Sequence, residues 1–348
     1  MPERKEQKQL RHLLKGYDEG WLKYEPKDEK TIDWIKYTQA QINEISNVLE
    51  LIRRIVDDAY VHIPDEISVG RPSKSACDKA KAILMQQFFQ CSNRVAEGFV
   101  KLFKEKLGIK EYLTYKDIER AYENPEVALI IHVAHQLSNE PVKDNEKDFC
   151  IDGTGLPESS KQNYASEKDK KKGKHKEMKG YEKLIAIFGN RYKLIGACDI
   201  AENFNDHESP YLKPLLDELM KVYQELNLFQ ADRAYLSRDN CTAIESYGGT
   251  PRIYPKSNTT LRQDGSRAWT QMLLAFITDP QQWLEEYHMR SVSESGNSAL
   301  KRRFPRNLLK KDDTRRKSEA FSRACIYNLR QLNYIHYLHP EINVFWLK

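Results

Sequence analysis

The first candidate for chemistry is the stretch YHMRSVSESGNSALK, residues 287–301. It places Tyr287, Arg290, Glu294 and Lys301 at offsets of 0, 3, 7 and 14. On one continuous helix, which turns by about 100° per residue, these four side chains would share a stripe about 60° wide. Lys301 would then lie roughly 10 Å beyond Glu294 along the axis, where it suits a neighbouring phosphate. A surface helix with an Arg–Glu pair at i, i+4 gives the same pattern, so the stripe alone is not decisive.

Two aspartates follow short runs that are typical of β-strands. Asp152 comes after FCI and before GTG, and Asp232 comes after LFQA. Carboxylates at adjacent strand ends, joined by a third from a nearby helix, can hold two divalent ions about 4 Å apart at a phosphodiester. Such oxygen ligands favour Mg²⁺ or Mn²⁺ over Zn²⁺. Either aspartate taken singly is equally compatible with an ordinary loop acid.

The elements that would position these residues lie between residues 146 and 338. Two β-rich runs, EKLIAIF and RYKLIGACDI, are joined by Gly189-Asn190, which is a two-residue hairpin signal. A helix follows, with Ser209 as its cap and Pro210 in its first turn. Further strands are expected at NLFQADRAY and TPRIYP, with helices between and after them. This order predicts a mixed α/β domain, with an antiparallel hairpin on one edge of a partly parallel sheet.

Residues 1–145 are expected to be almost entirely helical. We expect one long helix from about Ala76 to Leu107, ended by Gly108, and a short helix that begins with Thr114 and Asp117 in capping-box spacing. Asn124-Pro125 ends the short helix and begins another. A helix, a short turn and a second helix are compatible with a DNA-reading helix-turn-helix and equally with a plain helical bundle. We therefore expect two units, residues 1–145 and 146–338.

Composition and charge indicate the cellular compartment and the kind of binding partner. The 348-residue chain contains no run of about 18 apolar residues and no secretory signal at its N-terminus. Its six cysteines are scattered without a CxxC, which is typical of free thiols in a reducing cytoplasm. Residues 161–183 hold nine Lys and four acids, and residues 297–318 hold nine Lys or Arg and two acids. Two such basic segments predict a polyanion partner, unless both are solvated loops.

The motifs together resemble a known family. Tyr287, Arg290, Glu294 and Lys301 match the Y-x(2)-R-x(3)-E-x(6)-K signature of DDE transposases from prokaryotic insertion sequences. CIDGTGLP resembles the segment around that family's first Asp, and LFQADRAYLS resembles the segment around its second. YPKSN, at residues 254–258, resembles a further basic strand-end segment of the family. The resemblance covers about residues 146–337.

This resemblance implies an RNase H-like fold and a metal-dependent reaction on DNA. Asp152, Asp232 and Glu294 would be the catalytic residues and would ligate two Mg²⁺ ions, for which Mn²⁺ can substitute. The enzyme would cleave the ends of an insertion sequence and join the freed 3′-hydroxyl to target DNA. Its expected partners are the terminal inverted repeats and the target DNA, bound by a homodimer. The expected location is the cytoplasm, in association with the nucleoid.

Contacts to DNA are expected from six residues outside the acidic triad. Tyr287 would donate a hydrogen bond or stack on a base, Arg290 would grip the scissile region, and Gly296 would let a DNA strand approach. The complete list of expected DNA contacts is Tyr287, Arg290, Lys301, Lys256, Arg302 and Arg303. By analogy alone, residues 1–145 would bind the terminal repeats or aid dimerisation. Two alternatives stay open at this point: a nuclease without strand transfer, and a DNA-binding protein derived from a transposase.

Overall fold

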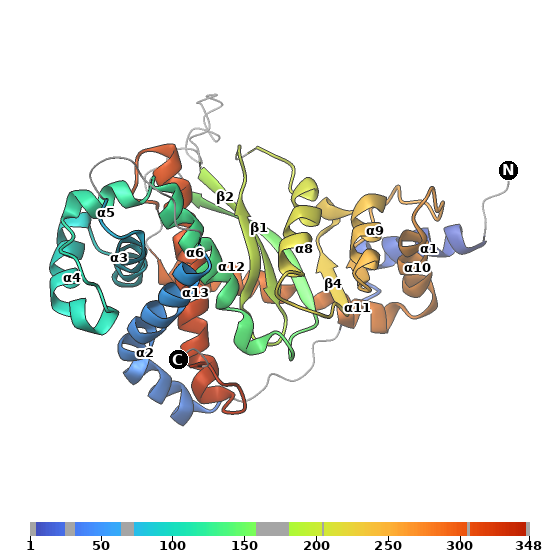
Figure 1. Cartoon of the computed structure of the whole chain (residues 1–348). Helices are drawn as coiled ribbons and strands as arrows, with labels where there is room; N and C mark the ends of the chain where they lie inside the picture. The colour runs from blue at the N-terminus through green and yellow to red at the C-terminus, as the bar shows by residue number, and fades with distance from the viewer. Residues whose placement is uncertain are drawn as a thin grey trace, which may run out of the picture.

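A five-stranded mixed sheet forms the centre of the molecule (Figure 1). The computed structural model describes residues 5–24, 32–63, 73–157, 181–203, 205–304 and 307–345. The strands are β1 (Phe149–Pro157), β2 (Tyr181–Gly189), β3 (Ile195–Ile200), β4 (Leu228–Ala231) and β5 (Thr250–Ile253). They are ordered β3-β2-β1-β4-β5. Strands β1, β4 and β5 are parallel to one another, and β2 is antiparallel to both of its neighbours, β1 and β3. The predicted sheet, with its hairpin at one edge, is confirmed.

Helices enclose the sheet, and the segment before it is helical as predicted. The N-terminal helices are α1 (Lys5–Glu19), α2 (Trp34–Val61), α3 (Ala76–Phe89), α4 (Asn93–Leu107), α5 (Tyr115–Ala121) and α6 (Pro125–Leu137). The later helices are α8 (Leu212–Leu219), α9 (Arg238–Ser246), α10 (Arg267–Thr278), α11 (Pro280–His288), α12 (Ser291–Arg303) and α13 (Asp313–Leu338). Short 3₁₀ turns are η1 (Glu140–Val142), η2 (Ser209–Tyr211) and η3 (Arg233–Tyr235). The predicted RNase H-like fold class is confirmed.

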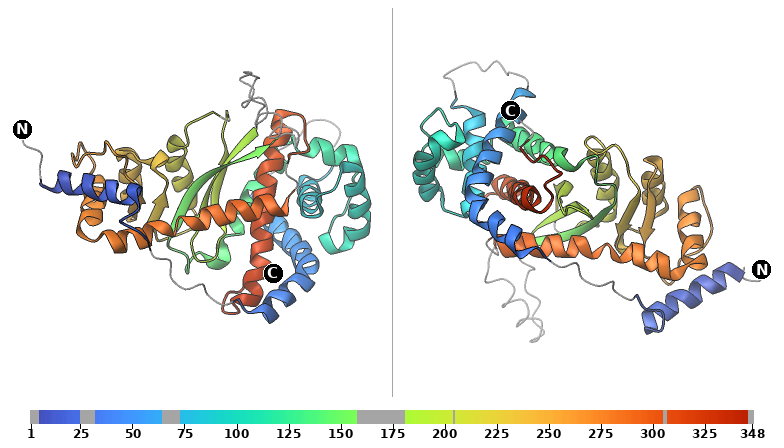
Figure 2. Two further views of the ribbon diagram at one scale, coloured as in Figure 1. Left: turned by 180° about the vertical axis from the view of Figure 1, so that it is seen from behind. Right: turned by 90° about the horizontal axis from the view of Figure 1, so that it is seen from below.

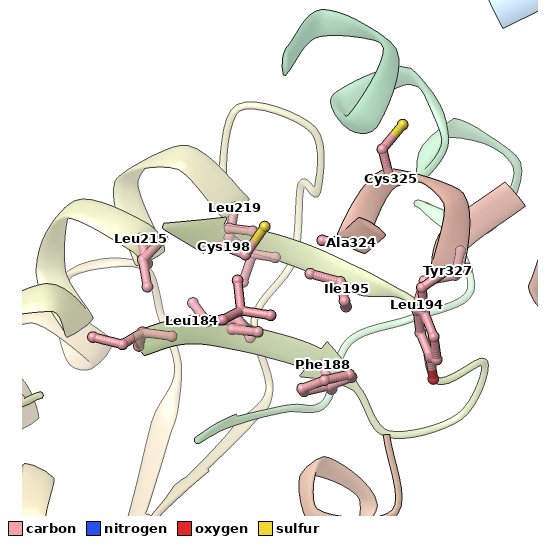
Figure 3. Packing of buried hydrophobic residues seen from close by; sticks show 14 of the residues in the cluster. Leu184, Phe188, Leu194, Ile195, Cys198, Leu215, Leu219, Ala324, Cys325 and Tyr327 are labelled. Carbon is pink, nitrogen blue, oxygen red and sulfur yellow. The ribbon is translucent and has the colours of Figure 1, made fainter. Parts of the chain in front are cut away.

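Different helices cover the two faces of the sheet. Adjacent residues of a strand point to opposite faces, and on β1 the ring of Phe149 packs at 4.8 Å from that of Tyr223, just after α8. The next residue, Cys150, faces Ser293 on α12. Figure 2 shows α11 and α12 running end to end across the sheet as far as α13. The side chains packed around β2 and β3, from α8 and from α13, are seen in Figure 3.

Helix α13 lies among the N-terminal helices. It packs against α2, α3 and α6, and also against β2 and β3 (Figure 1). The last helix of the predicted catalytic unit therefore shares a core with residues 1–145, and the boundary near residue 145 stays a prediction. At the other end of the molecule α1 packs on α10, where the Gln7 amide donates to the Thr259 carbonyl oxygen at 2.9 Å. No described helix has the length and apolar composition needed to cross a bilayer.

The helix expected over residues 76–107 is two helices, so this prediction was wrong. Gln90 ends α3 in the left-handed conformation at φ 53°, and Ser92 caps α4 by accepting from the backbone N–H of Val95. The Gln86 side chain bridges the break by donating to the Cys91 carbonyl and to Asn93. Ser92 was the available signal in the sequence, because serine is a preferred N-cap. The capping box of Thr114 and Asp117 is confirmed.

Two further local predictions need correction. The hairpin turn is longer than two residues, because Glu146 accepts hydrogen bonds from the backbone N–H groups of Arg191 and Tyr192 and holds residues 190–194 as a loop. Ser209 makes no cap: it opens the 3₁₀ turn η2, and α8 begins only at Leu212. Neither difference moves the strands that carry the candidate acids.

Candidate active site

The sheet brings the two predicted aspartates together. Strands β1 and β4 are parallel neighbours in which Ile151 pairs with Ala231. Asp152 is the next residue of β1, which continues to Pro157, so the expectation that this aspartate ends a strand was wrong. Asp232 directly follows the last residue of β4, as predicted, and the two backbones lie side by side at the carboxyl end of β4. The chain turns at once after β4, where the Asp232 carboxylate accepts from the backbone N–H of Arg233 and begins η3. Two carboxylates that were 80 positions apart in the sequence thus share one site.

The stretch from Tyr287 to Lys301 is two helices, so the assumption of one continuous helix was wrong. Tyr287 belongs to α11 and Arg290 is the N-cap residue of α12. Where the two helices meet, the backbone N–H groups of Arg290 and Ser293 donate to carbonyl oxygens only three residues earlier, which is the tighter 3₁₀ pattern. Across this junction Tyr287 still interacts with Arg290, and Arg290 pairs with Glu294 on α12.

Tyr287 is a buried ring rather than an open stacking surface. It is 7% exposed and lies between Tyr254 and Trp283, with both ring centroids 5.4 Å away. Burial raises the pKa of its hydroxyl to about 12, and the charge of Arg290 opposes that shift. A base cannot stack on a ring that is already covered on these sides, so that half of the prediction does not fit this arrangement. Its hydroxyl is directed toward Arg290, to which it hydrogen-bonds.

Arg290 lies among the three candidate acids. Its guanidinium forms an ion pair with Glu294 at 2.5 Å. Burial raises the pKa of Asp152, and the positive charge of Arg290 is the main influence against this rise. Burial also disfavours the charge on Arg290 itself, yet Tyr287, Glu294 and Asp232 together raise its pKa. One cation is therefore held at the centre of the predicted acidic triad.

The donor chemistry of these acids fits a hard divalent cation. Asp152 and Asp232 offer carboxylate oxygens at one edge, as Mg²⁺ requires. The Glu294 side chain is 55% exposed and is turned to Arg290, so it reaches the aspartates only by leaving that ion pair. In the described part of the chain, no three His, Cys, Asp or Glu side chains are grouped closely enough to hold one metal ion. Magnesium or manganese therefore stays a prediction that rests on donor type.

Three residues of this site were missed at the sequence level. The Asn297 amide, one turn after Glu294, donates to the Asp152 carboxylate at 3.1 Å. The Tyr235 hydroxyl, three residues after Asp232, donates to Glu208 at 3.0 Å. The Glu208 carboxylate fills the space where a side chain at Gly153 would otherwise lie. The positions of Asn297 and Tyr235 relative to the acids were available as a signal, whereas nothing in the sequence pointed to Glu208.

Gly296 has a different role from the one predicted. A Cβ atom at this position would lie 2.4 Å from a ring carbon of Phe188. The glycine therefore lets α12 approach β2 closely, because the helix backbone takes the space of a side chain. Gly296 faces the core of the protein and is buried there, so the predicted approach of a DNA strand at this residue was wrong.

The four predicted cationic DNA contacts beside Arg290 lie in different surroundings. Lys256 is exposed just beyond β5. Because β5 is parallel to β4, this lysine lies past the same ends of the strands as Asp232. Lys301 is exposed at its outer part, and partial burial lowers its pKa while the charge of Asp152 opposes that shift. Arg302 is exposed on the last turn of α12. These three side chains remain open to a phosphate.

Arg303 is engaged inside the protein. Its guanidinium pairs with Glu44 of α2 at 3.1 Å and lies over the Tyr334 ring at 5.1 Å. Glu44 also pairs with Arg330 at 2.8 Å. This contact with the N-terminal helices does not favour the predicted DNA role of Arg303, because a phosphate would have to displace Glu44.

The basic segment 297–318 is neutralised internally over much of its length. The Arg315 guanidinium pairs with Glu119 and Glu123 of the N-terminal region, and that of Arg316 pairs with Glu182. The Lys310 ammonium lies over the Tyr122 ring at 4.1 Å, and burial lowers its pKa. The other predicted basic segment, 161–183, lies outside the described residues except for 181–183. The number of basic residues in this segment therefore overestimates the positive charge that is exposed near α13.

Two comparisons with known proteins give the family of this chain. The family described as transposase DDE domain matches residues 144–329, which is more than half of the chain and includes Asp152, Asp232 and Glu294. A probable transposase for insertion sequence element ISA1214 of Archaeoglobus fulgidus is 26% identical over 323 residues, covering 92% of this chain and 94% of its own length. The chain therefore belongs to the transposase DDE domain family and is an enzyme that acts on DNA.

Proposed function

We propose that this protein is the transposase of an insertion sequence, which cleaves the ends of its element and joins the 3′-hydroxyl to target DNA. The observation that carries the proposal is the register of β1 and β4, which sets Asp152 beside Asp232 with Arg290 among the acids. The sequence-wide similarity to an insertion-sequence transposase supports the same assignment. The expected cytoplasmic, nucleoid-associated location belongs to this proposal because its substrate is the element's DNA.

In this proposal Asp152, Asp232 and Glu294 hold Mg²⁺, with Mn²⁺ as a substitute. Such ions, when bound, polarise the scissile phosphate and help to deprotonate the attacking water or hydroxyl. Asp152 and Asp232 are held in place by the sheet, whereas Glu294 lies on the exposed side of α12 and can change rotamer.

Arg290 has the corresponding role toward DNA. Its fork of N–H donors fits the several oxygens of a phosphate better than it fits a single carboxylate oxygen. When Arg290 turns to the scissile phosphate, it releases Glu294 toward the aspartates. Tyr287, fixed in its aromatic cluster, supports the guanidinium through its hydroxyl rather than by touching a base. Lys256 follows β5 near the acids, and Lys301 is close enough to Asp152 to be influenced by its charge, so both would hold phosphates near the cut.

The proposal is tested with duplex DNA that carries the terminal inverted repeats of the element. Asp152→Asn, Asp232→Asn and Glu294→Gln should each reduce Mg²⁺-dependent cleavage to the uncatalysed background and leave DNA binding largely intact. Asp239→Asn, an exposed acid in the first turn of α9, is the matched control and should cleave normally. Cleavage retained by all three site variants would exclude the assignment.

A target plasmid in the same reaction distinguishes the transposase from its alternatives. Joined products are expected for the transposase, whereas a nuclease on this scaffold would give cut ends only. Binding of the repeats without any Mg²⁺-dependent cleavage by the wild-type chain would instead indicate a DNA-binding derivative. The predicted homodimer can be examined in parallel by measuring the mass of the protein–DNA complex in solution.

A further inference from the structure

Asn297 is a polar residue on the face of α12 that packs against the sheet. It is 6% exposed, and the same face buries Val292, Gly296, Leu300 and a second polar residue, Ser293, whose hydroxyl donates to the Arg290 carbonyl oxygen at 2.7 Å. A buried amide at such a place needs a partner. The partner of its Nδ2 atom is the Oδ2 atom of Asp152, at 3.1 Å. The contact therefore joins α12 directly to a predicted metal ligand.

The same helix carries the third acid. Glu294 precedes Asn297 by three residues, so the two side chains lie one turn apart on neighbouring positions of α12. The helix is also seated by Gly296 against Phe188, which pairs with Cys150 two residues before Asp152. Ser293 also contacts Cys150 on β1. Of these contacts between α12 and the two strands, the one from Asn297 ends on a candidate acid.

We propose that Asn297 is a positioning residue of the metal site, which orients the Asp152 carboxylate relative to α12 and so relative to Glu294. This inference rests on the proposed function and names one more residue on which it depends. An amide suits the task because it donates to a carboxylate without adding a charge of either sign. A carboxylate at the same position would repel Asp152, and an ammonium would compete with a cation for it.

A further observation supports this role. The Asn297 Oδ1 atom is buried with no hydrogen-bond partner among the described residues. A contact that only joined a helix to a sheet would be better made by an apolar side chain, so the amide is explained by what its Nδ2 atom does for Asp152.

The test measures Mn²⁺ binding to the full-length protein without DNA, by electron paramagnetic resonance titration. Asn297→Leu keeps the branching of the side chain and removes the donor, and it should weaken Mn²⁺ binding by about 10- to 100-fold, as loss of a ligand-orienting hydrogen bond does elsewhere. Asn297→Ala removes the donor without adding branches and should give the same loss if the leucine variant folds poorly. Thermal unfolding is followed for each variant.

Asn333→Leu is the matched control. Asn333 is a buried asparagine of α13 whose amide donates to the Ala40 carbonyl at 2.8 Å, away from the acids. This variant should lower the Tm and leave Mn²⁺ affinity unchanged. Wild-type affinity in both Asn297 variants, or an equal loss in Asn333→Leu, would overturn the positioning role. If Asp152→Asn and Asp232→Asn also bind Mn²⁺ like the wild type, the proposed function fails as well, which is a distinguishable result.

Discussion

The first half of α12 and the segment from Arg303 onward use charged residues in opposite ways. At the first, site end, Arg290 and Asn297 interact with the candidate acids, and Glu294 is exposed enough to exchange its partner. From Arg303, the last residue of α12, onward, several cations are bound to acids of the N-terminal helices, whereas Lys301 and Arg302 just before it stay exposed. The contacts at the site end can be replaced by a substrate, whereas the segment from Arg303 onward, the closed end, is held by contacts within the protein.

The difference shows that a count of charges does not locate a nucleic-acid surface. Nine cations within residues 297–318 predicted a DNA-binding segment. Several of them hold α13 and the preceding loop to residues 1–145 instead, and only those with no competing acid at hand remain open to phosphate. Three experiments can break or sharpen this comparison.

The largest effect is expected at the closed end, for Arg323→Met. The Arg323 guanidinium donates to Glu319 at 2.7 Å, and both side chains are almost fully buried. Glu319 in turn accepts from the backbone N–H groups of Leu309 and Lys310. Removing the cation leaves a buried carboxylate uncompensated, which should lower the free energy of unfolding by about 3–5 kcal/mol in urea denaturation.

Two comparisons test the reason for that loss. Lys213→Met, in an exposed i, i+4 pair with Asp217, should change the free energy of unfolding by no more than about 0.5 kcal/mol. The double variant Glu319→Leu/Arg323→Met should be more stable than Arg323→Met, because no buried charge remains alone. A double variant less stable than both single ones would mean that the closed end depends on packing around the pair rather than on its charges.

An intermediate effect is expected from Gly296→Ala, which probes how tightly the site end of α12 is seated. The added Cβ would lie 2.4 Å from the Phe188 ring, so overpacking of about 1–3 kcal/mol should exceed the helix-propensity gain of about 1 kcal/mol. We expect net destabilisation of about 1 kcal/mol in thermal or urea unfolding, together with slower end cleavage, since α12 must move away from β1.

Gly98 is the matched control in the helix interior of α4. No atom lies within 4 Å of a Cβ built at this residue, so Gly98→Ala should stabilise the protein by roughly 0.5–1 kcal/mol. Opposite signs for the two glycines are the expected result. Equal stabilisation by both alanines would show that Phe188 yields easily and that α12 is not held closely to the sheet.

The smallest effect concerns the salt dependence of DNA binding. Lys301→Ala should reduce the slope of log K against log salt by about one unit, the expectation for one lost phosphate contact on duplex DNA. Arg303→Ala should leave the slope unchanged and lower the Tm, because its guanidinium is bound to Glu44. Equal slope changes in fluorescence anisotropy titrations would mean that DNA displaces Glu44 and that the segment from Arg303 onward is not closed to DNA.

Much of the site could be predicted from sequence, because β-forming runs and motif spacing are local properties. Asp152 and Asp232 follow β-branched, aromatic and apolar runs that form parallel neighbours in the sheet, and their juxtaposition follows from that topology. The N-caps at Thr114 and Asn124 were readable for the same reason. The break between α11 and α12 was not, because no Pro or Gly marks it and the residues around it are compatible with a continuous helix.

By itself the sequence determined the helical first part, the mixed sheet, the order of the three acids and the family to which they point, since each depends on residues close together in the chain or on their order. Only the tertiary structure decided which charges remain open. Arg303 meets Glu44 and Asn297 meets Asp152 across 259 and 145 positions. Gly296 forms a close contact between α12 and the sheet, and not an opening for DNA, because Phe188 packs onto it. Such pairings depend on how whole helices pack, and helical periodicity specifies which face a helix buries but not which partner covers it.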